Sequence, residues 1–207
     1  MLLAQLVQEA GFPPGVINVL SGFGPDCGRA LARHAHVDKI VFTGSTATGH
    51  KIVQYSAESN LKKVTLELGG KSPLIVCDDA DLEAAADAAR DGLFGNSGQV
   101  CCASSRIFVD SKVYDRFVQM CVDRAKKITM GTEEGKFQGP QVDEIQFKKI
   151  LAYIECGKQQ GAKCILGGKR YGTTGYYIEP TIFSDVQDEM KIAKEEIFGP
   201  VMQLMKV

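Results

Sequence analysis

The sequence predicts an α/β protein built on a parallel sheet with helical crossovers. Short apolar runs bounded by glycine and proline indicate buried strands, and longer segments with helical spacing lie between them. Strands that alternate with helices are typical of parallel sheets. With 44% hydrophobic and 24% charged residues in 207, the chain has the composition of one good core or two modest domains.

The first third of the chain predicts two crossover units. Its apolar start is interrupted by Gln5 and Glu9 and has no cationic flank, so it indicates an amphipathic helix and not a secretion signal. A buried strand is predicted at Val16–Leu20, between a Pro-Pro-Gly turn and a Ser-Gly pair. The next elements are a helix, a strand, a helix and a strand, predicted at Asp26–His34, Lys39–Phe42, Thr46–Ser59 and Lys63–Leu68.

Beyond the pair Gly69-Gly70, which we interpret as a hinge between two α/β layers, the alternation continues. Strands are predicted at Pro73–Cys77, Arg106–Val109, Cys164–Leu166, Tyr176–Phe183 and Val201–Val207. Helices are predicted at Asp81–Leu93, Val113–Ile128 and Val142–Gln160. The polar segment 131–139 predicts a loop on the surface.

Composition argues against several classes of function. The net charge is -1 and the lysines are scattered, so we expect no nucleic-acid partner. No apolar segment approaches the roughly 20 residues that span a bilayer, so we expect no membrane partner. The seven cysteines lack CxxC spacing, and no histidine is near the adjacent pair; we therefore expect free thiols in a reducing compartment and no metal site.

Two glycine loops stand at predicted helix starts, where backbone N–H groups and the helix dipole favour an anion. FTGSTATGHK is not the phosphate loop of nucleotide hydrolases, since His50 stands where that loop needs lysine. Nor does the spacing of Gly44 and Gly49 match the GxGxxG pattern, and SGFGPDCG has one residue too many before its last glycine. By itself, each loop is either an anion site or a plain βα turn.

Glu67 stands near the end of a strand whose apolar residues alternate with it. The carboxyl ends of parallel strands are where α/β folds gather ligands. The two glycines that follow allow close backbone approach. Both a functional carboxylate and a solvated strand-end glutamate are consistent with this pattern.

Cys101 and Cys102 are adjacent in SGQVCCASSR, and adjacent cysteines rarely bridge one another because the ring distorts the peptide. A nucleophilic thiol needs a clear approach. Gly98 and the small residues Ala103 and Ser104 leave one open. The residues alone do not choose between the two thiols.

Four motifs occur in an informative order: FTGSTATG, LELGGKSP, SGQVCCASSR and KEEIFGPV. In order and spacing they resemble the NAD(P)-dependent aldehyde dehydrogenases, closest to the cytosolic and mitochondrial tetrameric branch, and the resemblance runs through essentially the whole chain. It implies an aldehyde dehydrogenase-like α/β fold: part of a Rossmann-type cofactor domain at 1–69, then part of an α/β catalytic (thiol) domain at 70–207. Family chains are more than twice as long, so we expect a fragment with little or no activity alone.

The resemblance also implies roles for individual residues. The family pattern of glycine, glutamine or glutamate, any residue and the catalytic cysteine makes Cys101 the nucleophile, and Glu67 matches the general base. Val100 and Cys102 match substrate-channel positions. The positions that match cofactor-binding residues are Gly24, Gly44, Ser45, Gly49, Leu68, Gln146, Lys149, Glu196 and Phe198.

The implied reaction is oxidation of an aldehyde to an acid through a cysteine thiohemiacetal and a thioester, with a hydride passing to the nicotinamide. The cofactor is NAD, and NADP is not excluded because the deciding acidic position precedes the matched segment. We expect a small aldehyde as substrate and a homotetrameric parent in the cytoplasm or the mitochondrial matrix. Two alternatives are a thiol esterase and a non-catalytic binding or structural derivative of the fold.

Overall fold

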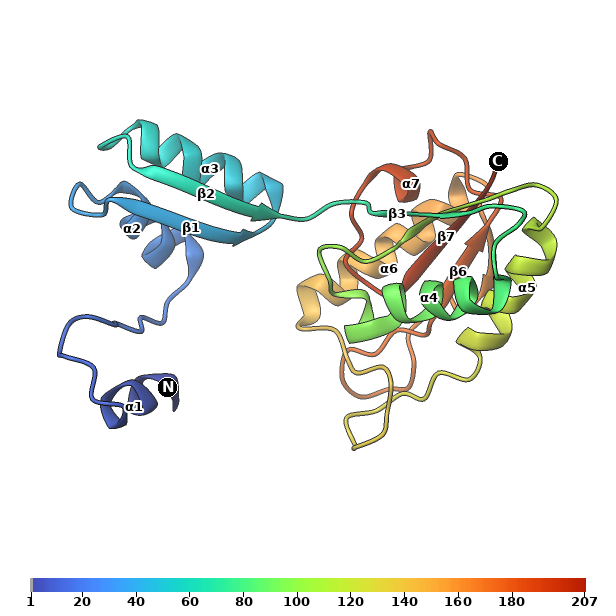
Figure 1. Ribbon diagram of the computed structural model, residues 1–207, viewed down its shortest axis with the longest axis horizontal. Coiled ribbons are helices and arrows are strands. Elements are labelled where there is room, and N and C mark those ends of the chain that lie inside the picture. The colour runs from blue at the N-terminus through green and yellow to red at the C-terminus, as the bar shows by residue number, and fades with distance from the viewer. Residues whose placement is uncertain (1) are drawn as a thin grey trace. The chain divides into compact units, whose positions relative to one another are not determined.

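The computed structural model, drawn in Figure 1, describes residues 2–207 and divides into two compact units. Unit 1 ends at Leu68 and unit 2 begins at Gly69, one residue before the predicted boundary. The α/β fold class predicted from the sequence is confirmed, since both units combine helices with parallel strands.

Unit 1 is a parallel βαβ crossover with short helices before it (Figure 1). Strand β1 (Lys39–Gly44) leads into α3 (Thr46–Ala57), which packs against β2 (Lys63–Leu68). The preceding helices are α1 (Leu2–Glu9), a π-helical turn η1 (Gly24–Gly28) and α2 (Arg29–Arg33).

The buried strand predicted at Val16–Leu20 is wrong. Residues 16–20 belong to no strand, and Val16 and Leu20 are 64% and 67% exposed. An apolar run forms a strand only when a neighbouring backbone pairs with it, and no described strand pairs with this segment.

Unit 2 contains a five-stranded sheet in the order β3-β4-β7-β6-β5. The first four run parallel, and β5 pairs antiparallel with β6 at the edge. In that order the strands are Pro73–Val76, Arg106–Val109, Val201–Lys206, Thr181–Ser184 and Lys163–Leu166. The helices are α4 (Leu82–Phe94), the 3-10 turn η2 (Gly95–Gly98), α5 (Tyr114–Ala125), α6 (Glu144–Gln159) and α7 (Lys191–Lys194).

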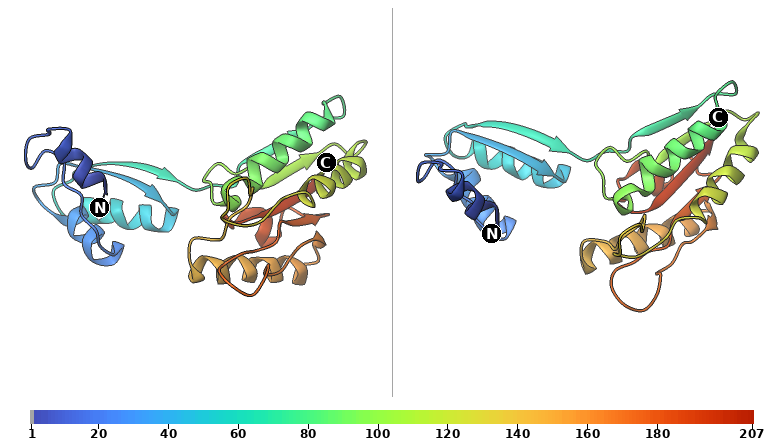
Figure 2. Two further views of the ribbon diagram at one scale, coloured as in Figure 1. Left: turned by 90° about the horizontal axis from the view of Figure 1, so that it is seen from below. Right: turned by 60° about the horizontal axis from the view of Figure 1, so that its bottom comes forward.

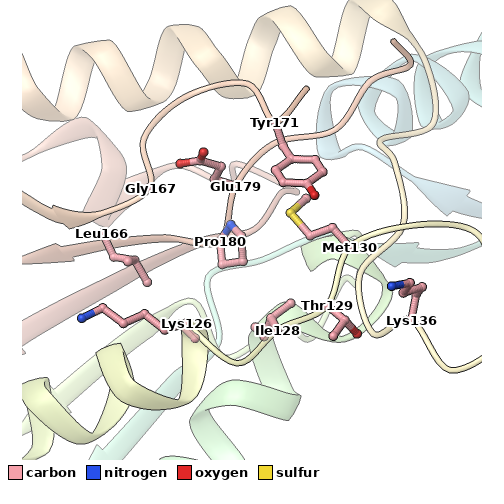
Figure 3. A pocket seen from close by; sticks show the side chains of 11 residues that line it. Lys126, Ile128, Thr129, Met130, Lys136, Leu166, Gly167, Tyr171, Glu179 and Pro180 are labelled. Atoms are coloured by element: carbon pink, nitrogen blue, oxygen red, sulfur yellow. The ribbon is translucent and has the colours of Figure 1, made fainter. Parts of the chain in front are cut away.

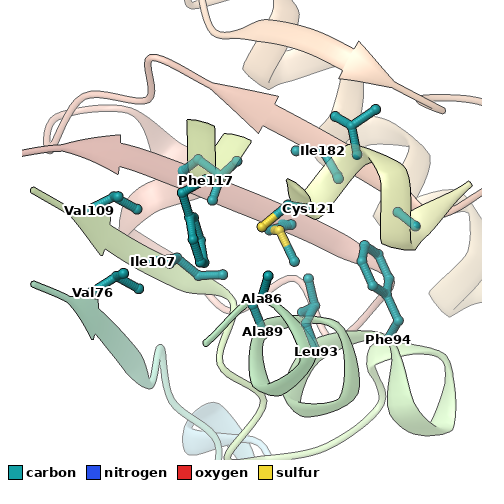
Figure 4. Close-up of a cluster of buried hydrophobic side chains, with 14 of the residues drawn as sticks. Val76, Ala86, Ala89, Leu93, Phe94, Ile107, Val109, Phe117, Cys121 and Ile182 are labelled. Carbon is teal, nitrogen blue, oxygen red and sulfur yellow. The ribbon is translucent and has the colours of Figure 1, made fainter. Parts of the chain in front are cut away.

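Helices cover both faces of this sheet, with α4 and α5 on one face and α6 on the other (Figure 2). Side chains of the central strands alternate between the two sides: Ile107 and Leu204 join the α4–α5 core, whereas Phe108 and Met205 join the α6 core. Figure 4 shows the α4–α5 core, where Phe117 is fully buried. Unit 2 therefore has the two-sided burial typical of parallel sheets.

Two further predictions need correction. The strand predicted at Tyr176–Phe183 is too long: β6 spans only Thr181–Ser184, and Ile178 makes an isolated bridge to Arg170. The segment 131–139 is mostly exposed, but Gln138 is fully buried and its Nε2 donates to the Ile178 carbonyl at 2.7 Å. Four glycines in the segment 167–178 have left-handed φ angles, so this segment is a loop and not a continuation of the strand.

Candidate active site

In unit 1, the turn between β1 and α3 presents a helix N-terminus. Ser45 is the N-cap of α3, and its Oγ accepts a hydrogen bond from the Thr48 N–H at 3.3 Å. The 12-residue helix starts directly after the carboxyl end of β1. Its first-turn N–H groups and its dipole are suited to an anion.

Gly49 allows α3 to lie close against β2. A Cβ at this buried glycine would lie 3.0 Å from Leu68 Cδ2 and 3.5 Å from Leu66 Cδ1. The predicted cofactor residue Leu68 thus packs under α3. At Gly44 a Cβ would come 2.5 Å from the ring of Phe42, so a side chain would displace that ring.

Gly24 lines a pocket of about 310 Å³ next to the first turn of α3. Its other walls include Phe42, Thr48 and Tyr55, so the pocket is largely apolar and reaches the N-terminal turn of the helix. An apolar pocket beside a helix N-terminus suits a nucleotide. The pocket can take a flat base, and the helix N–H groups can bind phosphate. Unit 1 therefore fits the predicted cofactor.

Glu67 lies at the same edge of unit 1 as this helix start. It stands opposite Thr43 in the parallel pair, and Leu68 stands opposite Gly44. Its side chain is exposed. The Glu67 carboxylate is therefore accessible to a ligand at the carboxyl end of the sheet.

In unit 2, the predicted nucleophile follows a loop of three consecutive left-handed residues. Asn96, Ser97 and Gly98 have φ of 49°, 58° and 72°. A Cβ at Gly98 would lie 2.2 Å from the Gly199 carbonyl oxygen and 2.8 Å from the Pro200 nitrogen. Only glycine fits this position, because the backbone is left-handed and another backbone is in contact with it.

Gln99 fastens the loop to the segment before α6. Its Oε1 accepts from the Val142 N–H at 2.9 Å, and its Nε2 donates to the Pro140 carbonyl at 3.4 Å. The buried Ser97 donates through Oγ to the Gly139 carbonyl at 2.9 Å. The sequence does not reveal these hydrogen bonds, because the partners of Ser97 and Gln99 are more than 40 residues away along the chain.

Cys101 and Cys102 come next, and both are exposed and free. Exposure does not separate the two thiols, so Cys101 as the nucleophile stays a prediction that the family resemblance implies. Val100 is half-buried and packs against the α4–α5 core, which limits how much of it can face a substrate.

Glu196 and Phe198 approach the cysteine loop within unit 2. A narrow cleft of about 10 Å³ is lined by both, together with Gly70, Gly98 and Val100. Phe198 has φ of 58°, a left-handed conformation that is unusual for a bulky residue and marks a strained loop.

Gln146 holds that strained loop in place. Its Nε2 donates to the carbonyl oxygens of Ile197 and Phe198, each at 2.9 Å. Lys149, one turn later on α6, is exposed, and its Nζ lies 5.8 Å from the centre of the Tyr153 ring. The predicted contacts of Gln146 and Lys149 with a cofactor stay predictions.

A larger pocket in unit 2 is separate from these residues. It measures about 390 Å³ and lies between the segment after α5 and the loop after β5, where Lys126, Lys136 and Glu179 line it (Figure 3). None of the predicted site residues contributes to it.

Within residues 2–207, no three His, Cys, Asp or Glu side chains cluster in a way that could hold a metal ion. Nor does any described helix have the length and apolarity that crossing a membrane requires.

Comparison with known proteins matches residues 1–207 to the model of the aldehyde dehydrogenase family. A mitochondrial benzaldehyde dehydrogenase of Antirrhinum majus is 58% identical over all of the chain and 39% of its own length. A mitochondrial aldehyde dehydrogenase of Mesocricetus auratus is 56% identical over all of the chain and 42% of its own length. The NAD+ complex of a Bacillus cereus aldehyde dehydrogenase superimposes with a TM-score of 0.96 at 48% identity, over 99% of this chain and 42% of that one.

This chain belongs to the aldehyde dehydrogenase family. It spans 39 to 42% of the length of these relatives.

Proposed function

We propose that this chain carries the cofactor loop, the general base and the nucleophile of an NAD(P)-dependent aldehyde dehydrogenase, which converts an aldehyde to a carboxylic acid. The observation that carries the proposal is the exposed Cys101 at the end of a well-supported loop. Gly98 lets this loop pack against Gly199, and Gln99 holds it by a hydrogen bond to Val142. A nucleophile needs both a clear approach and a rigid support.

The chain's own residues have distinct tasks in this reaction. The Cys101 thiolate adds to the aldehyde carbon, and the main-chain N–H of Cys101 donates to the oxyanion that forms. After oxidation, the acyl group remains on sulfur as a thioester. Glu67 then accepts a proton from the water that attacks the thioester, which releases the acid and returns the thiolate.

Unit 1 supplies the binding groups for the cofactor. The first turn of α3, capped by Ser45, would hold the phosphates, and the pocket beside Gly24 would hold the adenosine end. In unit 2, Glu196 and Phe198 would hold the nicotinamide end. When bound, the nicotinamide supplies the hydride acceptor that the thiol adduct needs.

The remaining parts of the proposal concern the whole protein. Residues 1–69 are part of the cofactor domain, and residues 70–207 are part of the catalytic domain. The substrate is a small aldehyde, the parent is a homotetramer, and nucleic acid and membranes are not partners. Its compartment is the cytoplasm or the mitochondrial matrix, in keeping with relatives from both.

A chimera tests the proposal. The matching segment of the Mesocricetus auratus relative is replaced by this chain, and NADH formation from acetaldehyde and benzaldehyde is followed. We expect turnover in the chimera and a loss of about 1000-fold or more for Cys101→Ser, the scale of nucleophile removal in other covalent enzymes. Cys102→Ser is the matched control, with a change mainly in the preference between the two aldehydes.

Two results would contradict the proposal. Turnover that survives Cys101→Ser and is lost in Cys102→Ser would show that the other thiol attacks. Ester hydrolysis without cofactor, at a rate above aldehyde oxidation, would favour a thiol esterase instead.

A further inference from the structure

Lys71 carries a buried amine at the edge of the candidate site. It stands between Gly70 and β3, and its carbonyl accepts a hydrogen bond from Arg106 Nη2 at 3.2 Å. Its Nζ is buried and has no hydrogen-bond partner among the described residues, and the same holds for Arg106 Nε. Two buried cationic groups side by side are costly unless an anion or a loss of charge compensates them.

The nearby anion is Glu196, and its carboxylate is bound elsewhere. Glu196 Oε1 accepts a hydrogen bond from the Gly70 N–H at 3.2 Å. A Cβ at Gly69 would lie 2.1 Å from Glu196 Oε2, so the carboxylate rests directly on the Gly69-Gly70 backbone. Residues 2–207 contain no ion pair between Lys71 and Glu196 within 4.0 Å.

We propose that Lys71 is a positioning residue for Glu196, and that the charge of its amine selects between two positions of the Glu196 carboxylate. With a neutral amine, the carboxylate stays on the Gly70 N–H. When the amine takes a proton from solvent, the carboxylate moves to the ammonium and leaves Gly70.

Burial and nearby charges set the pH at which the Lys71 amine changes its charge. Burial lowers the pKa of the Lys71 amine most, Arg106 on β4 lowers it further, and Glu196 raises it; the result is about 7. From β7, the side chain paired with Arg106 is Gln203, which is buried and carries no charge. The ammonium form therefore dominates below about pH 7, and the neutral form dominates above it.

The consequence of this change for cofactor binding rests on the proposed function. Glu196 matches a residue that flanks the nicotinamide ribose, so a change in its position changes how firmly that end of the cofactor is held. Lys71 itself is not a catalytic residue in this account, because it acts through Glu196.

NMR on the chain without cofactor or substrate tests the inference. Lysine Cε and glutamate Cδ are labelled with carbon-13 and followed from pH 5.5 to 9, and Lys71→Met and Glu196→Gln assign the signals. We expect the Lys71 Cε and Glu196 Cδ signals to change together, with a midpoint near pH 7. Glu196→Gln should lower the Lys71 midpoint, because the carboxylate is the group that raises it.

Three variants make the test decisive. Lys71→Met should abolish the change at Glu196 Cδ and at the Gly70 amide nitrogen, whereas Lys126→Met, at an exposed lysine, should leave both unchanged. If Lys71→Met fails to fold, Lys71→Arg keeps a fixed charge and should abolish the same change.

The inference is overturned if Lys71 stays charged up to pH 9, or if the Glu196 change persists without the lysine. Both outcomes are read without cofactor, so they are independent of whether the chimera oxidises aldehydes. Loss of turnover in the chimera would in turn leave the coupled titration unaffected.

Discussion

The two units of this chain differ sharply in how they are held together. In unit 2, helices cover both faces of a five-stranded sheet and many large apolar side chains are fully buried. In unit 1, Ala32 is the one buried hydrophobic residue among those described, and Val41 on β1 is 64% exposed. Polar contacts do more there: the buried Lys62 donates to the Ala32 carbonyl at 2.7 Å, and Ser56 Oγ donates to the Lys62 carbonyl at 2.6 Å.

The predicted site residues fall into two groups, one on each unit. The proposed nucleophile stands on the unit with the large apolar core, where a loop of fixed geometry can be supported. The proposed cofactor loop and Glu67 stand on the unit in which this chain buries few apolar side chains. If this division holds, equivalent mutations in the two units have different effects on stability.

The largest effect is expected for Phe117→Ala in the core of unit 2. Phe117 is fully buried between α5 and the sheet (Figure 4), and removing such a side chain typically costs about 3–5 kcal/mol. Native-state amide hydrogen exchange reports each unit separately, so faster exchange should be confined to residues 69–207.

Val41→Ala in unit 1 is the control for that prediction. Because Val41 is exposed on β1, its truncation should change the stability of unit 1 by no more than about 0.5 kcal/mol. A larger loss at Val41 than at Phe117 would mean that unit 1 has the stronger core and would reverse the comparison.

In both units the sequence predicted local features better than strand pairing, for a physical reason. Asp81 and Asp143 cap α4 and α6 close to where the predicted helices begin, since capping is a local interaction. Strand pairing is not local, so the apolar run 16–20 was assigned to a strand that does not exist. The antiparallel direction of β5 was also not readable, because composition does not encode strand direction.

The same limit applies to the candidate site. The family resemblance predicts Cys101 as the nucleophile and Glu67 as the base, but the sequence could not show the hydrogen bonds of Gln99, whose partners come from residues 140–142. Nor could it show that the Lys71 amine is buried, because lysine is normally exposed and nothing local marks the exception.

A smaller effect is expected for Gly98→Ala in the cysteine loop. A left-handed backbone costs a residue with a Cβ about 1–3 kcal/mol, and the new methyl group would also collide with Gly199. Gly135→Ala is the matched control, since Gly135 has a φ of 81° but open space around it. The difference between the two variants in denaturant unfolding measures the collision alone.

Labelling of Cys101 by a thiol reagent gives that prediction a functional readout. We expect Gly98→Ala to change the labelling rate of Cys101 and Gly135→Ala to leave it as in the wild type. Equal stability and equal labelling in the two variants would show that the contact with Gly199 does not hold the loop.

The smallest effect compares one helix cap in each unit. Ser45→Ala and Asp81→Ala each remove a side-chain cap, and each should cost about 1 kcal/mol locally. Similar local losses should have unequal consequences, because the same free energy is a larger share of the stability of the unit with the smaller core. Hydrogen exchange should therefore accelerate throughout unit 1 in Ser45→Ala, but only near the start of α4 in Asp81→Ala. If acceleration stays local in both variants, unit 1 is as cooperative and as stable as unit 2 despite its exposed strands.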